Sequence, residues 1–85
     1  MAHLPSPEEN ARKVLSIYAH FQSRIGDALR SNNFLAVAVR RHIPISDIQD
    51  GLEYAVDAHW LERTDTGAMK LTQEGFKEMP EPGYR

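Results

Sequence analysis

The chain of 85 residues contains no cysteine. This absence excludes disulfide bonds, thiolate metal sites and a cysteine nucleophile. Long apolar runs are also missing, because the longest one, Phe34–Val39, falls far short of the roughly 18 residues that a membrane span requires. The first residues lack the basic and apolar regions of a signal peptide. We therefore expect a cytoplasmic protein with no membrane partner.

Patterns typical of catalytic and metal-binding sites are absent as well. The sequence has neither a glycine-rich phosphate loop nor a nucleophile elbow. Its four histidines, His3, His20, His42 and His59, include no pair at helical spacing, and no cysteine completes a zinc site. We therefore predict no enzymatic activity, no cofactor and no metal ion. His59 is expected in the core and His20 in solvent.

The composition that is present is that of one small folded domain. Hydrophobic residues make up 41% and charged residues 26% of the chain, which is typical of globular proteins rather than disordered ones. We expect one domain over residues 6–79, a flexible N-terminus over residues 1–5 and a flexible tail over residues 80–85.

A long amphipathic helix is predicted at the start of this domain. Ser6 and Glu9 match a capping box, and Pro7 stands at the first helical position. Apolar residues then recur with the period of a helix, and Gly26 is a natural stop. The face expected in the core consists of Ala11, Val14, Leu15, Ile17, Tyr18, Phe21 and Ile25.

The second predicted element is a short buried helix over residues 33–41. Its apolar run, Phe34–Val39, is ambiguous between helix and strand by periodicity alone. Arg40 and Arg41 favour a helix, because basic side chains suit a helix C-terminus. Pro44 prevents the helix from continuing.

A third helix is predicted to begin at Ser46, which forms a capping box with Gln49. Gly51 in its interior indicates either a close approach by another helix or a tolerated glycine. The apolar face consists of Ile48, Leu52, Ala55, Val56 and His59.

The rest of the domain has the pattern of a β-hairpin. Residues 60–63 and 68–71 are short runs separated by a turn that contains Gly67. Thr72 then caps a short helical turn that includes Phe76. The predicted fold class is α+β, with three helices, a two-stranded hairpin and a short C-terminal helical turn.

These elements resemble those of the winged-helix superfamily. The stretch Trp60-Leu61-Glu62-Arg63, a turn, and Leu71-Thr72-Gln73-Glu74-Gly75 is similar to the Gly-Trp-Leu … Leu-Thr-x-x-Gly ending of winged-helix regulators, with His59 in place of the first glycine. Pro44-Ile45-Ser46-Asp47-Ile48 resembles the start of a recognition helix. The resemblance implies a winged helix-turn-helix fold whose hairpin is the wing. It also implies a DNA-binding, transcription-regulating function, by analogy of fold.

The charge pattern argues against that function. Residues 1–45 carry six basic and three acidic residues, whereas residues 46–85 carry four basic and nine acidic ones. The exposed face of the third helix has no lysine or arginine, so it would bring carboxylates to the phosphates of DNA. The side chains on this face are Asp47, Asp50, Glu53, Tyr54 and Asp57.

Two functions follow as alternatives. In the first, the domain binds duplex DNA through phosphate contacts outside the third helix, and the main candidates are Arg40, Arg41, Arg63 and Lys70, with Arg12, Lys13 and His42 as further ones. In the second, the domain is a protein-interaction module whose acidic third helix binds a basic protein partner, with Tyr54 as a candidate hot spot. We expect a monomer or a homodimer.

Overall fold

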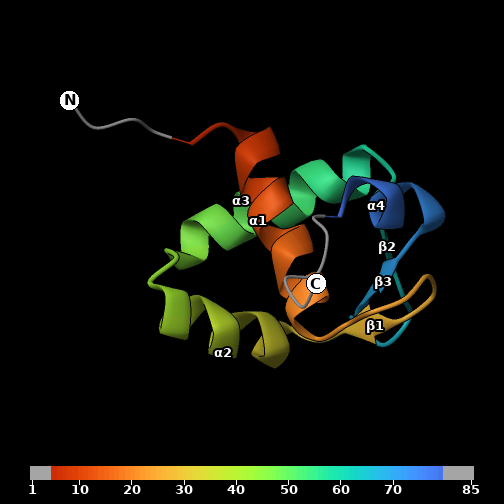
Figure 1. Cartoon of the computed structure of the whole chain (residues 1–85), viewed down its shortest axis with the longest axis horizontal. Coiled ribbons are helices and arrows are strands. Elements are labelled where there is room, and N and C mark those ends of the chain that lie inside the picture. Colours follow the sequence, from red (N-terminus) through yellow and green to blue (C-terminus); the bar gives the residue numbers. More distant parts are fainter. Residues whose placement is uncertain (1–4, 80–85) are drawn as a thin grey trace, which may run out of the picture.

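The computed structural model describes residues 5–79, in which four helices and three strands follow one another (Figure 1). The elements are α1 (Pro7–His20), β1 (Ala28–Leu29), α2 (Ser31–Arg41), α3 (Ile45–Asp57), β2 (Leu61–Arg63), β3 (Met69–Leu71) and α4 (Gln73–Glu78). The predicted α+β fold class, with three helices, a hairpin and a short C-terminal helix, is confirmed. Residues 1–4 and 80–85, predicted to be flexible, lie outside the described residues. None of the described helices is long and apolar enough to cross a membrane.

Helix α1 begins as predicted and ends earlier than predicted. The Ser6 hydroxyl accepts a hydrogen bond from the backbone N–H of Glu9 (3.1 Å), and the Glu9 carboxylate accepts one from the Ser6 N–H (2.7 Å). The helix stops at His20, so the prediction of a longer helix is wrong. Phe21 and Ile25 therefore leave the core face, and they are 41% and 53% exposed.

The same left-handed turn ends α1, α2 and α3. Gln22, His42 and His59 have φ values of 54°, 58° and 64°. In each case the next N–H reaches back five residues to a helix carbonyl. These bonds join Ser23 to Tyr18, Ile43 to Ala38 and Trp60 to Ala55, at 2.8 or 2.9 Å. This is the Schellman arrangement, in which a residue of positive φ closes the helix. His59 is thus an exposed turn residue, and the prediction of a core histidine is wrong.

Glycine at position 59 is expected to stabilise the domain. The left-handed conformation costs a residue with a Cβ atom roughly 1–2 kcal/mol, whereas glycine adopts it freely. Part of that gain is lost because glycine is more flexible in the unfolded chain. We therefore expect His59→Gly to raise the free energy of unfolding by about 1 kcal/mol, as measured by urea denaturation.

A glycine placed inside α3, rather than in the turn that follows it, provides the control. Gln49 lies on the exposed side of α3, so Gln49→Gly should lower the free energy of unfolding by about 0.5 kcal/mol. Loss of stability in both variants would contradict the left-handed turn at His59.

Helices α2 and α3 lie where helices were predicted, but their first turns differ from the prediction. Helix α2 begins at Ser31, and the Asn33 side chain accepts a hydrogen bond from the N–H of Arg30 (3.0 Å). Helix α3 begins directly after Pro44, so Ser46 lies inside the helix and its predicted capping box does not form. The φ of Pro44 is −59°, which the pyrrolidine ring fixes without any side-chain cap.

Strands β2 and β3 form the predicted hairpin, and β1 adds a third antiparallel strand that was not predicted. The strand order is β1-β3-β2, with Leu61 opposite Leu71 and Leu29 opposite Met69. Because β1 has only two residues, it carries no alternation that a sequence pattern could reveal. Helix α1 reaches this sheet through Tyr18, whose hydroxyl donates a hydrogen bond to the Met69 carbonyl (2.7 Å). Burial raises the pKa of Tyr18.

The core forms where α1 packs across α3 (Figure 1). Gly51 of α3 lies against the main chain of α1. A Cβ atom at Gly51 would lie 2.6 Å from the carbonyl carbon of Asn10 and 2.9 Å from the nitrogen of Ala11. Of the two interpretations of this glycine, the close approach is confirmed. The largest fully buried side chains are Tyr18, Phe34, Leu15, Ile17, Leu61, Leu71 and Val14.

The end of α3, the hairpin and α4 meet at Trp60, which is 9% exposed. The Thr72 hydroxyl accepts a hydrogen bond from the N–H of Gly75 (3.0 Å) and donates its proton toward the carbonyls of His59 (2.6 Å) and Trp60 (2.9 Å). A Cβ atom at Gly75 would lie 2.9 Å from the Trp60 carbonyl carbon. Thr72 and Gly75 therefore hold α4 against the backbone that leaves α3. The sequence predicts that Trp60, Leu61 and Leu71 are buried together with Phe21 and Leu52. The first three are buried together, whereas Phe21 is 41% exposed and Leu52 is half-buried.

Candidate interaction surfaces

Two of the five side chains predicted on the interaction face of α3 are engaged inside the molecule. Asp47 is half-buried, and its carboxylate lies 3.6 Å from the ammonium of Lys13 on α1. Tyr54 is half-buried with its ring against that of Trp60 in an edge-to-face contact, at 5.6 Å between ring centres. Both side chains thus contribute to packing between elements.

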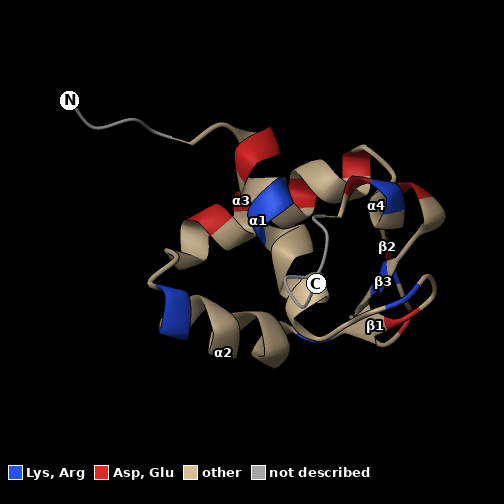
Figure 2. Cartoon of the chain, in the orientation of Figure 1, with Lys and Arg blue, Asp and Glu red and all other residues tan. Residues whose placement is uncertain are grey.

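The other three side chains, Asp50, Glu53 and Asp57, are exposed and form the acidic row of α3. Their spacings of three and four residues place them on one side of the helix. With Pro7 and Tyr54 they line a shallow hollow beside the N-terminus of α1. The first turn of α1 is acidic too, and Figure 2 shows it in red together with parts of α3. Because α3 carries no lysine or arginine, the acidic row presents only negative charge.

The basic residues of α1 that were candidate phosphate contacts are bound within the molecule. The Arg12 guanidinium lies 3.0 Å from the Glu8 carboxylate and 3.1 Å from that of Glu78. It also stacks over the Trp60 ring, 5.2 Å from the ring centre. Lys13 is engaged by α3, as described above. These two cations are therefore already compensated.

The four main candidate phosphate contacts do not come together in one patch. Arg40 and Arg41 lie at the C-terminal end of α2, whereas Arg63 and Lys70 lie on the hairpin, at the other side of the molecule in Figure 2. Lys70 is paired with Glu62 on the neighbouring strand (2.9 Å). Arg41 donates a hydrogen bond to a serine hydroxyl of α1 (3.0 Å). Two of the four are thus held by other side chains.

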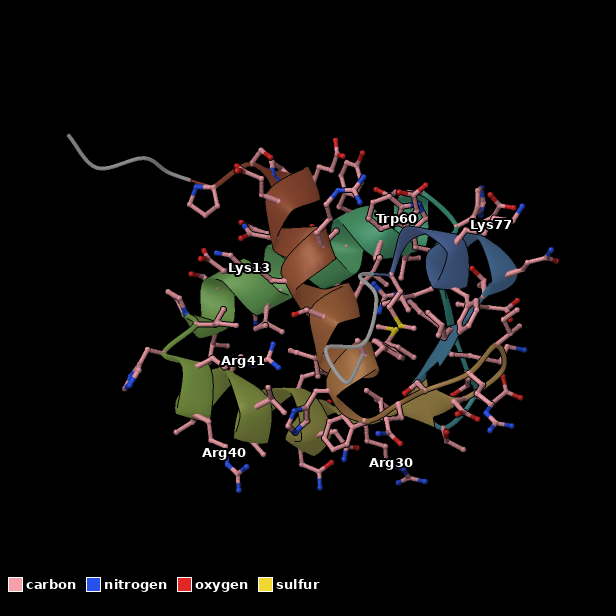
Figure 3. All side chains as sticks on the ribbon, viewed as in Figure 1. Lys13, Arg30, Arg40, Arg41, Trp60 and Lys77 are labelled. Carbon is pink, nitrogen blue, oxygen red and sulfur yellow. The ribbon has the colours of Figure 1, made fainter. Side chains whose placement is uncertain are left out.

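Apart from Arg41, four exposed arginines make no ion pair within residues 5–79. They are Arg24, Arg30, Arg40 and Arg63. Arg30 was not predicted as a contact, because it stands outside the helix that was predicted and has no basic neighbour. Figure 3 shows Arg30 and Arg40 pointing away from the body of the molecule at the two ends of α2, whereas Arg41 points toward α1. These cations are separate from one another rather than gathered into a basic stripe.

A groove with apolar walls lies between α2, α3 and the turn that joins β2 to β3, and we call it the α2–α3 groove. It is lined by Ser31, Phe34, Leu35, Ile45, Ile48, Gln49, Leu52 and Gly67. Phe34 and Ile48 are buried at 2% and 3% exposure, whereas Leu35 and Ile45 are 38% and 54% exposed. Leu52, predicted in the core, is half-buried.

This groove was not predicted from the sequence. The apolar run of α2 was interpreted as a wholly buried helix, which is wrong for Leu35, Ala36 and Val39. Val39 is 70% exposed. Both faces of the helix are apolar over this run, so no periodicity separates the side that faces the core from the side that faces solvent.

No group of three or more His, Asp or Glu side chains within residues 5–79 is placed to hold a metal ion. His42 and His59 close different helices, and the acidic row faces solvent. Comparisons with models of protein families, with curated proteins and with solved structures find no match. Function is therefore argued from the surfaces of the chain itself.

Proposed function

We propose that the chain is a non-enzymatic winged-helix domain that binds a basic protein partner through α3. The winged-helix assignment is supported by the order of three helices followed by an antiparallel hairpin. It is also supported by His59, which takes a left-handed conformation where the similar motif has glycine. Thr72 and Gly75 pack at the end of the same motif.

The kind of partner is inferred from the charge of the acidic row. Asp50, Glu53 and Asp57 are exposed, and in the described residues no cation of α1 or α3 neutralises them. A surface of this kind attracts a basic protein and repels the phosphates of DNA. An α3 that entered the major groove would invert the electrostatics that supply most of the affinity in DNA binding.

Duplex DNA is the second candidate partner, and one observation favours it. Arg24, Arg30, Arg40 and Arg63 are exposed, and no ion pair to a described residue compensates them. Phosphate contacts of this kind position a protein on DNA without reading its sequence. Such binding is weak and non-specific, and it takes place with α3 turned away from the duplex.

Neutralising the acidic row separates the two candidates. The double variant Asp50→Asn/Glu53→Gln is expected to bind a lysine–alanine repeat peptide roughly three- to tenfold more weakly than the parent chain, because two exposed charge pairs are lost. It is expected to bind mixed-sequence duplex DNA more tightly at low salt, because repulsion is removed. Fluorescence anisotropy measures both affinities. Asp65→Asn/Glu74→Gln is the control, since it changes the net charge equally at exposed sites outside α3.

The salt dependence identifies any DNA binding that remains. A chain that uses two or three separate arginines should show a shallow slope of log affinity against log salt, roughly −0.9 per phosphate neutralised. Sequence-specific DNA binding that is lost in Asp50→Asn/Glu53→Gln would show that α3 reads bases and would refute the proposed function. Equal peptide affinity in the test and control variants would refute it as well.

A further inference from the structure

The α2–α3 groove has a floor that belongs to the core and walls that do not. Phe34 and Ile48 at its floor are almost fully buried, whereas Leu35 and Ile45 expose 38% and 54% of their surface. No charged residue lines the groove. Aliphatic walls around a buried floor form a surface that gains free energy when another apolar side chain enters.

The surface around the groove continues along both helices, as an apolar face on α2 and a polar one on α3. Val39 lies one turn beyond Leu35 on the same side of α2 and is 70% exposed. On α3, Gln49 lies one turn beyond Ile45 and also lines the groove. From Ser31 to Val39 the helix α2 advances about 12 Å at 1.5 Å per residue, which matches about two turns of a docked helix.

The charges beside the groove favour one kind of partner. Glu53 lies one turn beyond the lining residue Gln49 on α3, so the acidic row begins beside this wall of the groove and continues away from it, toward the hollow that it lines with Pro7 and Tyr54. Of the cations at α2, Arg30 and Arg40 point outward at its two ends (Figure 3), whereas Arg41 is held by a serine hydroxyl of α1. The negative charges of α3 are therefore gathered beside one wall of the groove, whereas the outward-pointing arginines at the ends of α2 are isolated from one another.

We propose that the α2–α3 groove is the docking site for an amphipathic α-helix of a partner protein, with apolar side chains in the groove and lysine or arginine side chains against the acidic row. The proposal rests on the proposed function and specifies the form of the basic partner. The acidic row has spacings of three and four residues, so basic residues at the same spacings on the partner helix meet it. Apolar residues on the adjoining face of that helix enter the groove.

A designed peptide tests this docking site. The probe is a peptide of about 15 residues, the length at which isolated helices become stable, with leucines along one face and lysines along the adjoining face. A matched peptide carries glutamate in place of lysine. We expect the parent chain to bind the glutamate peptide at least tenfold more weakly in an anisotropy titration, and equal binding of the two peptides overturns the proposal.

Variants of the chain locate the binding surface. Ile45→Ser removes an exposed aliphatic wall and is expected to weaken binding of the lysine peptide about tenfold. Ile25→Ser, a matched change at a residue 53% exposed outside the groove, is expected to leave the affinity unchanged. Thermal melts of both variants should match the parent, because neither side chain is buried. Unchanged binding by Ile45→Ser overturns the groove as the site.

The acidic row provides an outcome that separates this inference from the proposed function. In one outcome, Asp50→Asn/Glu53→Gln weakens binding of both the lysine–alanine repeat peptide and the leucine–lysine peptide, while Ile45→Ser weakens binding of neither. That result supports the proposal of a basic partner and excludes the groove as its docking site. If Ile45→Ser alone weakens binding, the groove is used without charge recognition and both proposals fall. Sedimentation equilibrium tests a second copy as occupant, and a dimer that Ile45→Ser dissociates overturns the partner helix.

Discussion

Replacing Trp60 with alanine is expected to lower the free energy of unfolding by about 3–5 kcal/mol, the range for large aromatic side chains in a core. The indole is 9% exposed and packs edge-to-face on Tyr54, with the Arg12 guanidinium 5.2 Å above its ring. A domain of 85 residues has roughly 4–13 kcal/mol of stability in total, at about 0.05–0.15 kcal/mol per residue. The substitution therefore removes a large share of it.

Urea denaturation followed by circular dichroism measures this loss, because the chain has one tryptophan and fluorescence would lose its reporter. Trp60→Phe is the graded variant, since it keeps an aromatic ring against Tyr54 and should lose less stability than the alanine variant. Phe76→Ala is the control at an aromatic residue that is 41% exposed, and a small loss is expected there. A Trp60→Ala chain that unfolds like the parent would mean that Trp60 is a surface residue.

Features determined by adjacent residues could be predicted from the sequence. Ser6 and Glu9 form their capping box because both partners lie within one turn. The hairpin follows from two short runs around Gly67. Trp60 is buried where its motif indicates, between the end of α3 and the hairpin. In these cases the local sequence contains both sides of the interaction.

The end of α2 at Arg41 is the predicted one, but the end of α1 could not be predicted, because its left-handed position holds Gln22 rather than glycine. The prediction took Gly26 as the end of α1, since glycine has the strongest preference for such a turn. The actual end at His20 releases the chain toward β1, whose partner β3 comes about 40 residues later in the sequence. The preference of Gly26 for a helix end was therefore outweighed by the pairing of β1 with β3, which no pattern of neighbouring residues contains.

The candidate surfaces show the same division. Helical spacing was sufficient to place Asp50, Glu53 and Asp57 on one exposed side of α3. It could not show that Asp47 is paired with Lys13, because that contact depends on how α1 packs across α3. The α2–α3 groove is still further from prediction, since its walls come from two helices and the hairpin turn.

Replacing Gly51 with alanine is expected to destabilise the domain, although the same change in an open helix would stabilise it by about 1 kcal/mol. The added Cβ atom would lie 2.6 Å from the carbonyl carbon of Asn10, and the obstacle is backbone that no rotamer change can move away. The helices α1 and α3 must therefore separate along their crossing, which loosens the packing around Ala11 and Ala55. We expect a net loss of about 1–3 kcal/mol or more.

The sign of the change at Gly51 is the decisive measurement in urea denaturation. Gln49→Ala is the matched control, because it introduces alanine on the exposed side of the same helix and should change the free energy of unfolding by less than about 0.5 kcal/mol. Gly51→Val should lower the free energy of unfolding more than Gly51→Ala, since its two additional methyl groups force α1 and α3 further apart. A Gly51→Ala chain more stable than the parent would show that α1 and α3 separate at no cost. The tight crossing would then contribute nothing to the position of α3, from which the acidic row and one wall of the groove project.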